Sequence, residues 1–384
     1  MPDYQSFLLL ALVMVLGLIL YRRISSTGAD PQPGDCAGGS VFIHPSSSQA
    51  GMILEAALQK DRGTGISSAV VVDGKLIYAD AIGQADRKSK LGANALMRTG
   101  SIAKLFTAVA AARLVEMNLL DLHSPIAAIV PEFAHGGITP FQLGTHFSGI
   151  RQYNFQKLSE ANNRKLFRSQ ADAIELFASD PLLSNPGEAF HYSSFGYNLL
   201  GLVVERVYGS PFAKALHDLV TEPLGVFSLK LDDTAAEIPC RPVFYTMAFG
   251  RLRIQAPLRN NSDLYPSGGQ LVTAGDLAVF GDTVFNGENL QPDTIRLFTN
   301  PGTTPAGDPG GYSFGWQLGR AEDGRIEWYG HGGQINGAYA SVRYYPASKL
   351  TIAGMSNYNL WLTSSPPEFF HAVRRDLPAI FSKT

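Results

Sequence analysis

Strand patterns occur near both ends of this 384-residue chain, and their placement is the strongest constraint on its fold. Near the start, GISSAVVVDGKLIYADAIG contains two apolar runs joined at Asp73-Gly74, a dipeptide typical of a β-hairpin. After Gly311, four more segments have strand patterns, GYSFGWQLG, RIEWYGH, GAYASVRYYP and KLTIAGMSN, with Pro346 to Lys349 as a tight connection. We therefore expect the two ends of the chain to share one sheet.

Helical patterns fill the rest of the chain. Met52 to Lys60 reads as a short helix, and an apolar, alanine-rich helix begins near Ser101. From about Asp121 to Tyr265 the pattern is helices broken by Pro and Gly turns, and PPEFFHAVRRDLPAIF closes the chain as an amphipathic helix. These patterns predict an α+β fold, an antiparallel sheet flanked by helices with an inserted, mostly helical lobe and a site between the lobes.

The composition allows a large core, because 45% of the residues are hydrophobic and only 17% are charged. We expect one folded unit over residues 39–384, with an α/β lobe from about 39–120 and 266–384 and a helical lobe from about 121–265. The net charge of −2 and the scattered arginines and lysines predict no nucleic-acid partner.

Residues 1–38 form a separate region in the sequence. Its apolar run from Phe7 to Tyr21 is short for a membrane span, which needs roughly 17–25 residues, but Arg22 and Arg23 follow it, unlike in a cleaved signal peptide. We expect a membrane anchor. Two arginines favour a cytoplasmic domain only weakly, so the side stays open, with a periplasmic or other extracytoplasmic domain as our expectation.

The two cysteines, Cys36 and Cys240, leave two alternatives open. They are either two thiols without a role or one disulfide, which would need an oxidising compartment. Their spacing does not resemble a metal site, and the histidines are too dispersed for zinc. The sequence therefore implies neither a metal nor a cofactor.

Ser101 and Lys104 lie one helical turn apart in RTGSIAKLFTAVAAARLVE. Residues three apart share a helix face, so the amine of Lys104 can reach the hydroxyl of Ser101. Burial and the positive end of a helix lower a lysine pKa, which suits a base. On its own an S-x-x-K arises by chance about once in a chain of this length. The rival α/β-hydrolase pattern G-x-S-x-G occurs at Gly311 to Gly315, inside a segment that reads as a strand, and no serine has an Asp/His pair at a recognisable spacing.

Two later clusters carry further candidates. NPGEAFHYSSFGYNLLG places Tyr192 and Ser194 just before a helix, and HGGQING places His331 and Gly333 at the start of a strand, where glycine lets a substrate approach the backbone. Taken alone, each has a plainer interpretation. A tyrosine usually packs its ring in the core, and such a histidine is usually an ordinary surface or turn residue.

Together these clusters, in this order, resemble the serine beta-lactamase and penicillin-binding-protein superfamily, in its class C and D-alanyl-D-alanine carboxypeptidase branch. The resemblance runs from about Ile66 to Asn357 and includes THFSGI and SGGQLVTAGDLAVFG. Two segments are most similar to the mitochondrial serine beta-lactamase-like branch and its bacterial relatives, with esterases of the same fold as close rivals: THFSGIRQY and DPLLSNPGEAFHYSSFGYNLL.

The resemblance implies a role for each candidate. Ser101 is the nucleophile, Lys104 its base partner and Tyr192 the second proton-transfer group, with no choice between the last two as the base. It also implies that the backbone N–H groups of Ser101 and Gln334 form an oxyanion hole, and that Ser194, His331, Gly333 and Gln334 bind the substrate. The resemblance to the superfamily also implies a beta-lactamase/transpeptidase-like fold.

The sequence departs from the family pattern at two positions. Ser194 stands where the Tyr-x-Asn motif has asparagine, and Gly332 stands where penicillin-recognising members have threonine. Both changes weaken the binding of a β-lactam or of a peptide carboxylate, so we expect hydrolysis of small esters with weak or absent β-lactam turnover.

Three further residues carry separate expectations. His331 should change charge near neutrality. His146 is expected in a structural turn and Trp316 in the core or cleft lining.

Three functions remain open from the sequence. The leading one is a serine hydrolase that acts through an acyl-enzyme on a small ester, amide or peptide, without a cofactor. The alternatives are a cell-wall D-alanyl-D-alanine carboxypeptidase or penicillin sensor, and a non-catalytic assembly or binding protein on the same fold. A homo-oligomer is compatible with each of them.

Overall fold

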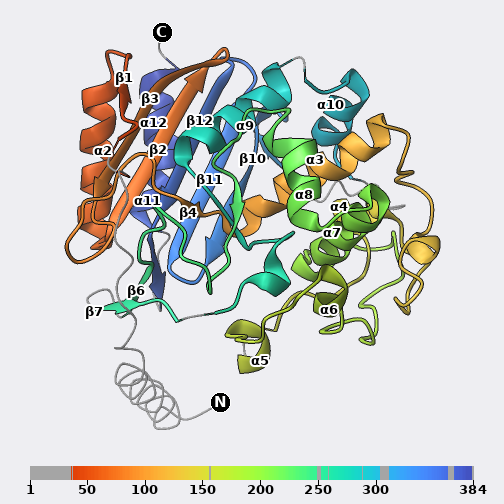
Figure 1. Cartoon of the computed structure of the whole chain (residues 1–384). Helices are drawn as coiled ribbons and strands as arrows, with labels where there is room; N and C mark the ends of the chain where they lie inside the picture. Colours follow the sequence, from red (N-terminus) through yellow and green to blue (C-terminus); the bar gives the residue numbers. More distant parts are fainter. Residues whose placement is uncertain are drawn as a thin grey trace, which may run out of the picture. The chain divides into compact units, whose positions relative to one another are not determined.

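The computed structural model describes residues 36, 38–154, 157–248, 252–257, 259–287, 289–302, 311–361 and 367–382. Its main feature is a seven-stranded sheet in which every described pair of neighbours is antiparallel (Figure 1). In spatial order the strands are β1 (Val41–Phe42), β3 (Lys75–Gly83), β2 (Gly65–Val72), β12 (Leu350–Ser356), β11 (Ala338–Tyr345), β10 (Ile326–Ile335) and β9 (Gln317–Arg320). The prediction that both ends of the chain share one antiparallel sheet is confirmed.

Strands β2 and β12 join the two ends of the chain at the centre of the sheet. Their register pairs Val70 with Ile352 and Ala69 with Ala353. All four of these residues are buried, because side chains that alternate along the strands enter two different cores. This burial on both faces explains why the central strands read as continuous apolar runs.

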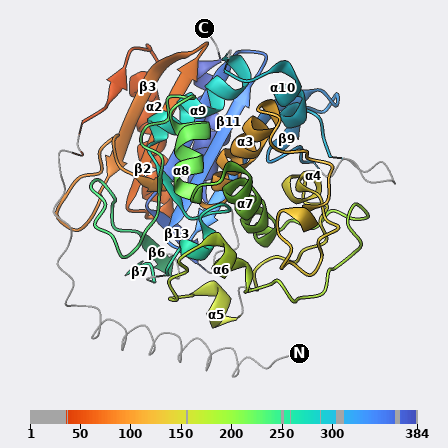
Figure 2. The same ribbon diagram turned by 45° about the vertical axis from the view of Figure 1, so that its right-hand side comes forward.

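Helices cover both faces of the sheet (Figures 1 and 2). α9 (Ala274–Asn286) packs on the face that carries Ala69 and Ala353. α2 (Ser47–Asp61) packs on the opposite face together with the C-terminal helices. The expected C-terminal helix is divided into α11 (Glu368–His371), a π-helical turn (Ala372–Asp376) and α12 (Leu377–Phe381).

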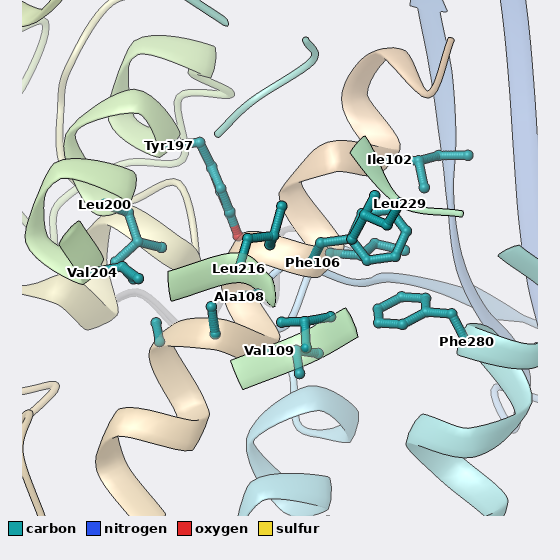
Figure 3. Close-up of a cluster of buried hydrophobic side chains, with 14 of the residues drawn as sticks. Ile102, Phe106, Ala108, Val109, Tyr197, Leu200, Val204, Leu216, Leu229 and Phe280 are labelled. Atoms are coloured by element: carbon teal, nitrogen blue, oxygen red, sulfur yellow. The ribbon is translucent and has the colours of Figure 1, made fainter. Parts of the chain in front are cut away.

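Helix α3 (Ala103–Glu116) is buried nearly all round and lies at the centre of the larger core. Figure 3 shows Phe106 and Val109 of α3 between Leu200 of α7 and Phe280 of α9. α7 spans Ser194–Tyr208, and α8 (Phe212–Leu216) and α4 (Pro140–Gly144) pack nearby. A helix enclosed in this way holds whatever its first turn carries in a fixed place.

The segment expected to be mostly helical also contributes strands. β6 (Tyr245–Ala248) pairs with β7 (Leu252–Gln255) and, in parallel, with β13 (Tyr358–Trp361). A second small sheet contains β5 (Lys230–Leu231), β8 (Gln270–Val272) and β4 (Met97–Arg98). These strands are short and find partners far away in the sequence, so local patterns do not predict them. The lobe boundaries at residues 121 and 265 stay predictions.

Cys36 and Cys240 form a disulfide, which decides between the two alternatives that the sequence left open. The apolar run from Phe7 to Tyr21, expected to be a membrane anchor, lies outside the described residues. In the described part of the chain, helices of sufficient length and apolarity to span a bilayer are absent.

Candidate active site

A tight turn delivers Ser101 to the start of α3. The chain leaves β4, passes Thr99, and enters a 3-10 turn (Gly100–Ile102) that continues into α3. Gly100 has a φ of +50°, and a Cβ built there would lie 2.7 Å from the backbone nitrogen of Gln334. Glycine is therefore needed at this position both for the left-handed backbone and for the close approach of β10.

Lys104 is fully buried beside Ser101. Its Nζ lies 3.1 Å from Ser101 Oγ, 3.1 Å from Ser194 Oγ and 2.8 Å from the carbonyl oxygen of Ser267. In the described part of the chain these hydrogen-bond partners are all uncharged, and burial lowers the pKa of Lys104 to about 7. A large share of Lys104 is therefore neutral at physiological pH.

The hydrogen bonds of a neutral Lys104 can be assigned. A neutral amine has two N–H donors and one lone pair. The carbonyl of Ser267 can only accept, so it takes one N–H, and the lone pair is free to accept a hydroxyl proton from Ser101 or Ser194. Donation by Ser101 is the arrangement that makes its oxygen nucleophilic.

Tyr192 lies just before α7, on the other side of the two hydroxyls. Its hydroxyl forms hydrogen bonds with the side chains of Ser101 and Ser194, and Lys104 Nζ lies 5.1 Å from the centre of its ring. Burial raises the pKa of Tyr192 strongly, so the phenol keeps its proton at neutral pH. Ser101 and Tyr192 are partly exposed, whereas Lys104 is not.

The start of α7 fixes the Tyr192 segment. Ser193 is the N-cap, with its Oγ accepting the N–H of Gly196 at 2.9 Å and donating to the carbonyl of Arg151 at 2.8 Å. Ser194 donates its N–H to Gln152 Oε1 at 2.8 Å. The sequence did not single out Gln152.

His331 lies on β10 and is buried. Its Nδ1 lies 2.5 Å from the carbonyl oxygen of Gly332, and its ring centre is 6.3 Å from that of Tyr192. Burial, followed by the charges of nearby Lys104 and Arg374, lowers the pKa of His331 to about 3, although the carbonyl bond opposes this. The expectation that His331 changes charge near neutrality is wrong, because desolvation outweighs its hydrogen bond.

The backbone N–H of Gln334 lies at the start of α3, beside Gly100. Tyr339, which faces Gln334 across the hairpin, donates its own N–H to Ser356 on β12. Gln334 and Tyr339 are therefore a non-hydrogen-bonded pair, and the Gln334 N–H projects from the opposite edge of β10. In the described ranges β9 covers that edge only up to Gly330. Ser101 N–H, in the first helical turn, has no intrahelical acceptor either.

Gly333 lies close to the turn that carries Ser101. A Cβ built on it would lie 2.0 Å from the carbonyl oxygen of Thr99. Glycine at this position therefore lets β10 pack against that turn, and substrate binding by Gly333 stays a prediction. The side chain of Gln334 is exposed.

Several residues near the site escaped the sequence analysis. Ser267 acts through its carbonyl group, which carries no side-chain signal. Tyr312 places its ring 5.7 Å from His331 and 6.0 Å from Tyr192. Trp316, which the sequence analysis expected either in the core or in the cleft lining, is buried in the core and stacks on Phe280.

Comparison with known proteins places this geometry in a family. Residues 53–371 match the family model described as Beta-lactamase. The chain belongs to the beta-lactamase family.

Two characterised relatives illustrate the spread within the beta-lactamase family. The mitochondrial serine beta-lactamase-like protein LACTB of Homo sapiens is 28% identical over 316 residues, covering 60% of this chain and 57% of the relative. Esterase EstB of Burkholderia gladioli is 32% identical over 194 residues, covering 45% of this chain and 48% of the esterase. The chain thus spans about half the length of these relatives.

Solved structures share the beta-lactamase-family fold. The octameric penicillin-binding protein homologue of Pyrococcus abyssi has a TM-score of 0.71 at 21% identity, over 88% of this chain and 78% of that one. The D-amino acid amidase of Ochrobactrum anthropi has a TM-score of 0.74 at 20% identity, over 88% of this chain and 100% of the amidase. At these identities the likeness concerns the fold alone.

Proposed function

We propose that this chain is a serine hydrolase that acts through an acyl-enzyme on small ester, amide or peptide substrates. The observation that carries the proposal is the buried amine of Lys104, 3.1 Å from Ser101 Oγ and without a carboxylate among its hydrogen-bond partners. With a pKa of about 7, this amine is a base near neutrality. Membership of the beta-lactamase family, which includes esterases and amidases, supports the same reaction class.

In the acylation step, Ser101 Oγ forms a bond to the substrate carbonyl carbon and its proton passes to Lys104. The carbonyl oxygen becomes an oxyanion between the N–H groups of Ser101 and Gln334, each worth roughly 3–4 kcal/mol in such sites. When the tetrahedral intermediate collapses, the bond to the leaving group breaks. Tyr192 donates its proton to that group and is reprotonated from Lys104 through their shared contact with Ser194.

Deacylation uses the same groups in reverse. Water loses a proton to the Lys104 and Tyr192 pair and forms a bond to the acyl carbon. The bond to Ser101 then breaks, and Ser101 regains its proton. Because His331 stays neutral, it lines the site as an uncharged wall in this scheme.

We propose esters, rather than β-lactams, as the better substrates. Ser194 Oγ already contacts Lys104 and Tyr192, and its single O–H cannot replace the NH2 group with which an asparagine at this position would hold a substrate carbonyl. Gly332 has no hydroxyl for a carboxylate. Similarity to an esterase supports the same preference.

The test is the intact mass of the full-length protein after incubation with a generic fluorophosphonate. A single adduct on the parent and none on Ser101→Ala would establish Ser101 as the nucleophile. Absence of an adduct on the parent would contradict the proposal and favour a non-catalytic binding or assembly role. Turnover of a p-nitrophenyl ester and a cephalosporin then ranks the substrate classes, and faster cephalosporin turnover would contradict the ester preference.

We also propose that the folded domain lies in an oxidising, extracytoplasmic compartment and that residues 7–21 anchor it to a membrane. The Cys36–Cys240 disulfide supports the first part, because disulfides persist mainly outside the reducing cytosol. A reporter fused after Thr384 tests it. A cytoplasmic reporter would contradict this location and would also place peptidoglycan out of reach.

A further inference from the structure

His146 has an uncommon backbone conformation. It is fully buried and has a φ of +65°, in the left-handed region that only a few per cent of non-glycine residues adopt, Asn, Asp and His more often than the others. Strain of this kind costs on the order of 1–3 kcal/mol and persists where surrounding contacts hold it. The contacts that hold His146 converge on Tyr192.

Two hydrogen bonds from His146 flank Tyr192. The backbone carbonyl of His146 accepts the N–H of His191 at 2.8 Å, and its Nδ1 accepts the N–H of Ser193 at 3.2 Å. One residue thus fixes the backbone immediately before and immediately after Tyr192. The imidazole also packs directly on the Tyr192 ring, with ring centres 4.5 Å apart.

The chemistry of these contacts defines the state of the imidazole. Nδ1 can accept a hydrogen bond only while it is unprotonated, so the proton of the neutral ring sits on Nε2. Burial, followed by the proximity of the Lys104 amine, lowers the pKa of His146 well below its ordinary value. Nε2 has no hydrogen-bond partner among the described residues, and the surrounding rings are those of Tyr192, Phe190, Tyr197 and Tyr312.

We infer that His146 is a positioning residue that holds the Tyr192 hydroxyl in line with Ser101 for proton donation to the leaving group. The inference rests on the proposed function and deepens it. It predicts an effect that a role in folding alone would not produce. Loss of His146 should slow reactions whose leaving group needs a proton, and spare those whose leaving group departs as a stable anion.

The chain offers a matched set of variants. His146→Asn tolerates the left-handed backbone and places an amide oxygen near the position of Nδ1, so it keeps an acceptor for Ser193 without the ring. His146→Gly tolerates the same backbone but has neither acceptor nor ring. His135→Asn is the control, because that histidine bonds to the carbonyl of Asp180 away from the site.

The experiment compares kcat/KM of the full-length variants on an ethyl ester and a p-nitrophenyl ester with the same acyl group. For His146→Gly we expect a loss of at least about tenfold on the ethyl ester and less than about threefold on the p-nitrophenyl ester, since a positioned acid contributes about 100-fold or more. His146→Asn should retain more activity on the ethyl ester than His146→Gly. Equal losses on both esters, or no loss on the ethyl ester, would overturn the inference.

A second measurement separates this inference from the proposed function. With fluorotyrosine incorporated, the ¹⁹F resonance of Tyr192, assigned with Tyr192→Phe, should be unchanged in His135→Asn and shifted or broadened in His146→Gly. An unchanged resonance in His146→Gly would overturn the inference even if the protein hydrolysed neither ester. A parent inactive on both esters, with the resonance shifted in His146→Gly, would contradict the proposed function and keep the positioning contact.

Discussion

Arg98 Nε donates to Asp232 Oδ2 at 2.7 Å, and both side chains are buried. Arg98 lies three residues before Ser101, and its Nη1 also donates to the carbonyl of Asn336, two residues after Gln334, at 2.9 Å. Arg98, held in place by Asp232, therefore links the two segments whose backbone N–H groups form the proposed oxyanion hole.

Asp232→Asn should be strongly destabilising, because it leaves the Arg98 guanidinium buried without its charge partner. We expect a loss of about 3–5 kcal/mol in the free energy of unfolding, measured by urea denaturation. The control is Asp73→Asn in the exposed Lys349–Asp73 pair, which should stay close to the parent. The Arg98→Met and Asp232→Leu double variant should recover stability but bind a boronic acid transition-state analogue more weakly. Unchanged binding of the boronic acid by the double variant would contradict the role of Arg98 in positioning the oxyanion hole.

Ester hydrolysis should rise with pH through about 7. Lys104 is the base only when neutral, and burial places its pKa at about 7, so the deprotonated and active fraction grows above that pH. The unfolded chain keeps this proton up to about pH 10.4, so the Lys104 contribution to stability also increases between about pH 7 and 10.4. A pH profile of kcat/KM checks the activity step. The step should persist in His331→Asn, since His331 is already neutral there, and its disappearance would contradict the assignment to Lys104.

Ser194→Asn should shift specificity toward β-lactams. The amide would restore a donor for a substrate carbonyl, and one such hydrogen bond is worth about 1 kcal/mol. We expect the ratio of cephalosporin to p-nitrophenyl ester turnover to rise by at least about fivefold. A ratio that falls or stays constant would show that Ser194 does not set this preference.

Gly332→Thr alone should not help β-lactam turnover. A Cβ at Gly332 would lie 2.5 Å from Nη2 of Arg374. This guanidinium is held by a 3.0 Å hydrogen bond from its Nε to Ser341 Oγ and by stacking on the Phe370 ring, so moving it aside would break both contacts. We expect lower thermal stability and no gain on a cephalosporin. Arg374→Ala should relieve the clash, and a gain in the single Gly332→Thr variant would show that Arg374 moves aside freely.

Gly333→Ala should damage both stability and activity. The new methyl group would meet the backbone oxygen of Thr99, which cannot move without displacing the turn before Ser101. Overpacking of this kind costs about 1–3 kcal/mol. Gly51→Ala is the matched control, because a Cβ there meets open space and alanine favours its helix by about 0.5–1 kcal/mol. Thermal unfolding and ester turnover should separate the two, and a Gly333→Ala protein equal to the parent would contradict the close packing.

Much of this arrangement follows from local patterns. The spacing of Ser101 and Lys104 predicted that their side chains meet, and the Asp73-Gly74 hairpin and the strands of both chain ends formed as expected. The small sheets could not be predicted from the local sequence. Their strands β6 and β13 lie more than a hundred residues apart, and neither is long enough to give a strand pattern.

Burial was the property that the sequence predicted least well. His331 looked like a titrating residue because its environment comes from Tyr192 and Tyr312, which are distant in the chain. The carbonyl of Ser267 bonds to Lys104 regardless of its side chain. His146 was expected in a structural turn, and only its backbone conformation and its hydrogen bond with Ser193 connect it with Tyr192.

The central pairing of β2 with β12 also sets an order of events during synthesis. β2 is made early and can pair at once with β3, but its other neighbour, β12, and the strand that carries Gln334 are synthesised only after the segments that fill the middle of the chain. A nascent chain that already carries Ser101 and Lys104 therefore still lacks the Gln334 N–H of the proposed oxyanion hole. On the proposed function, reactivity toward acyl compounds should appear only after β10 has been synthesised.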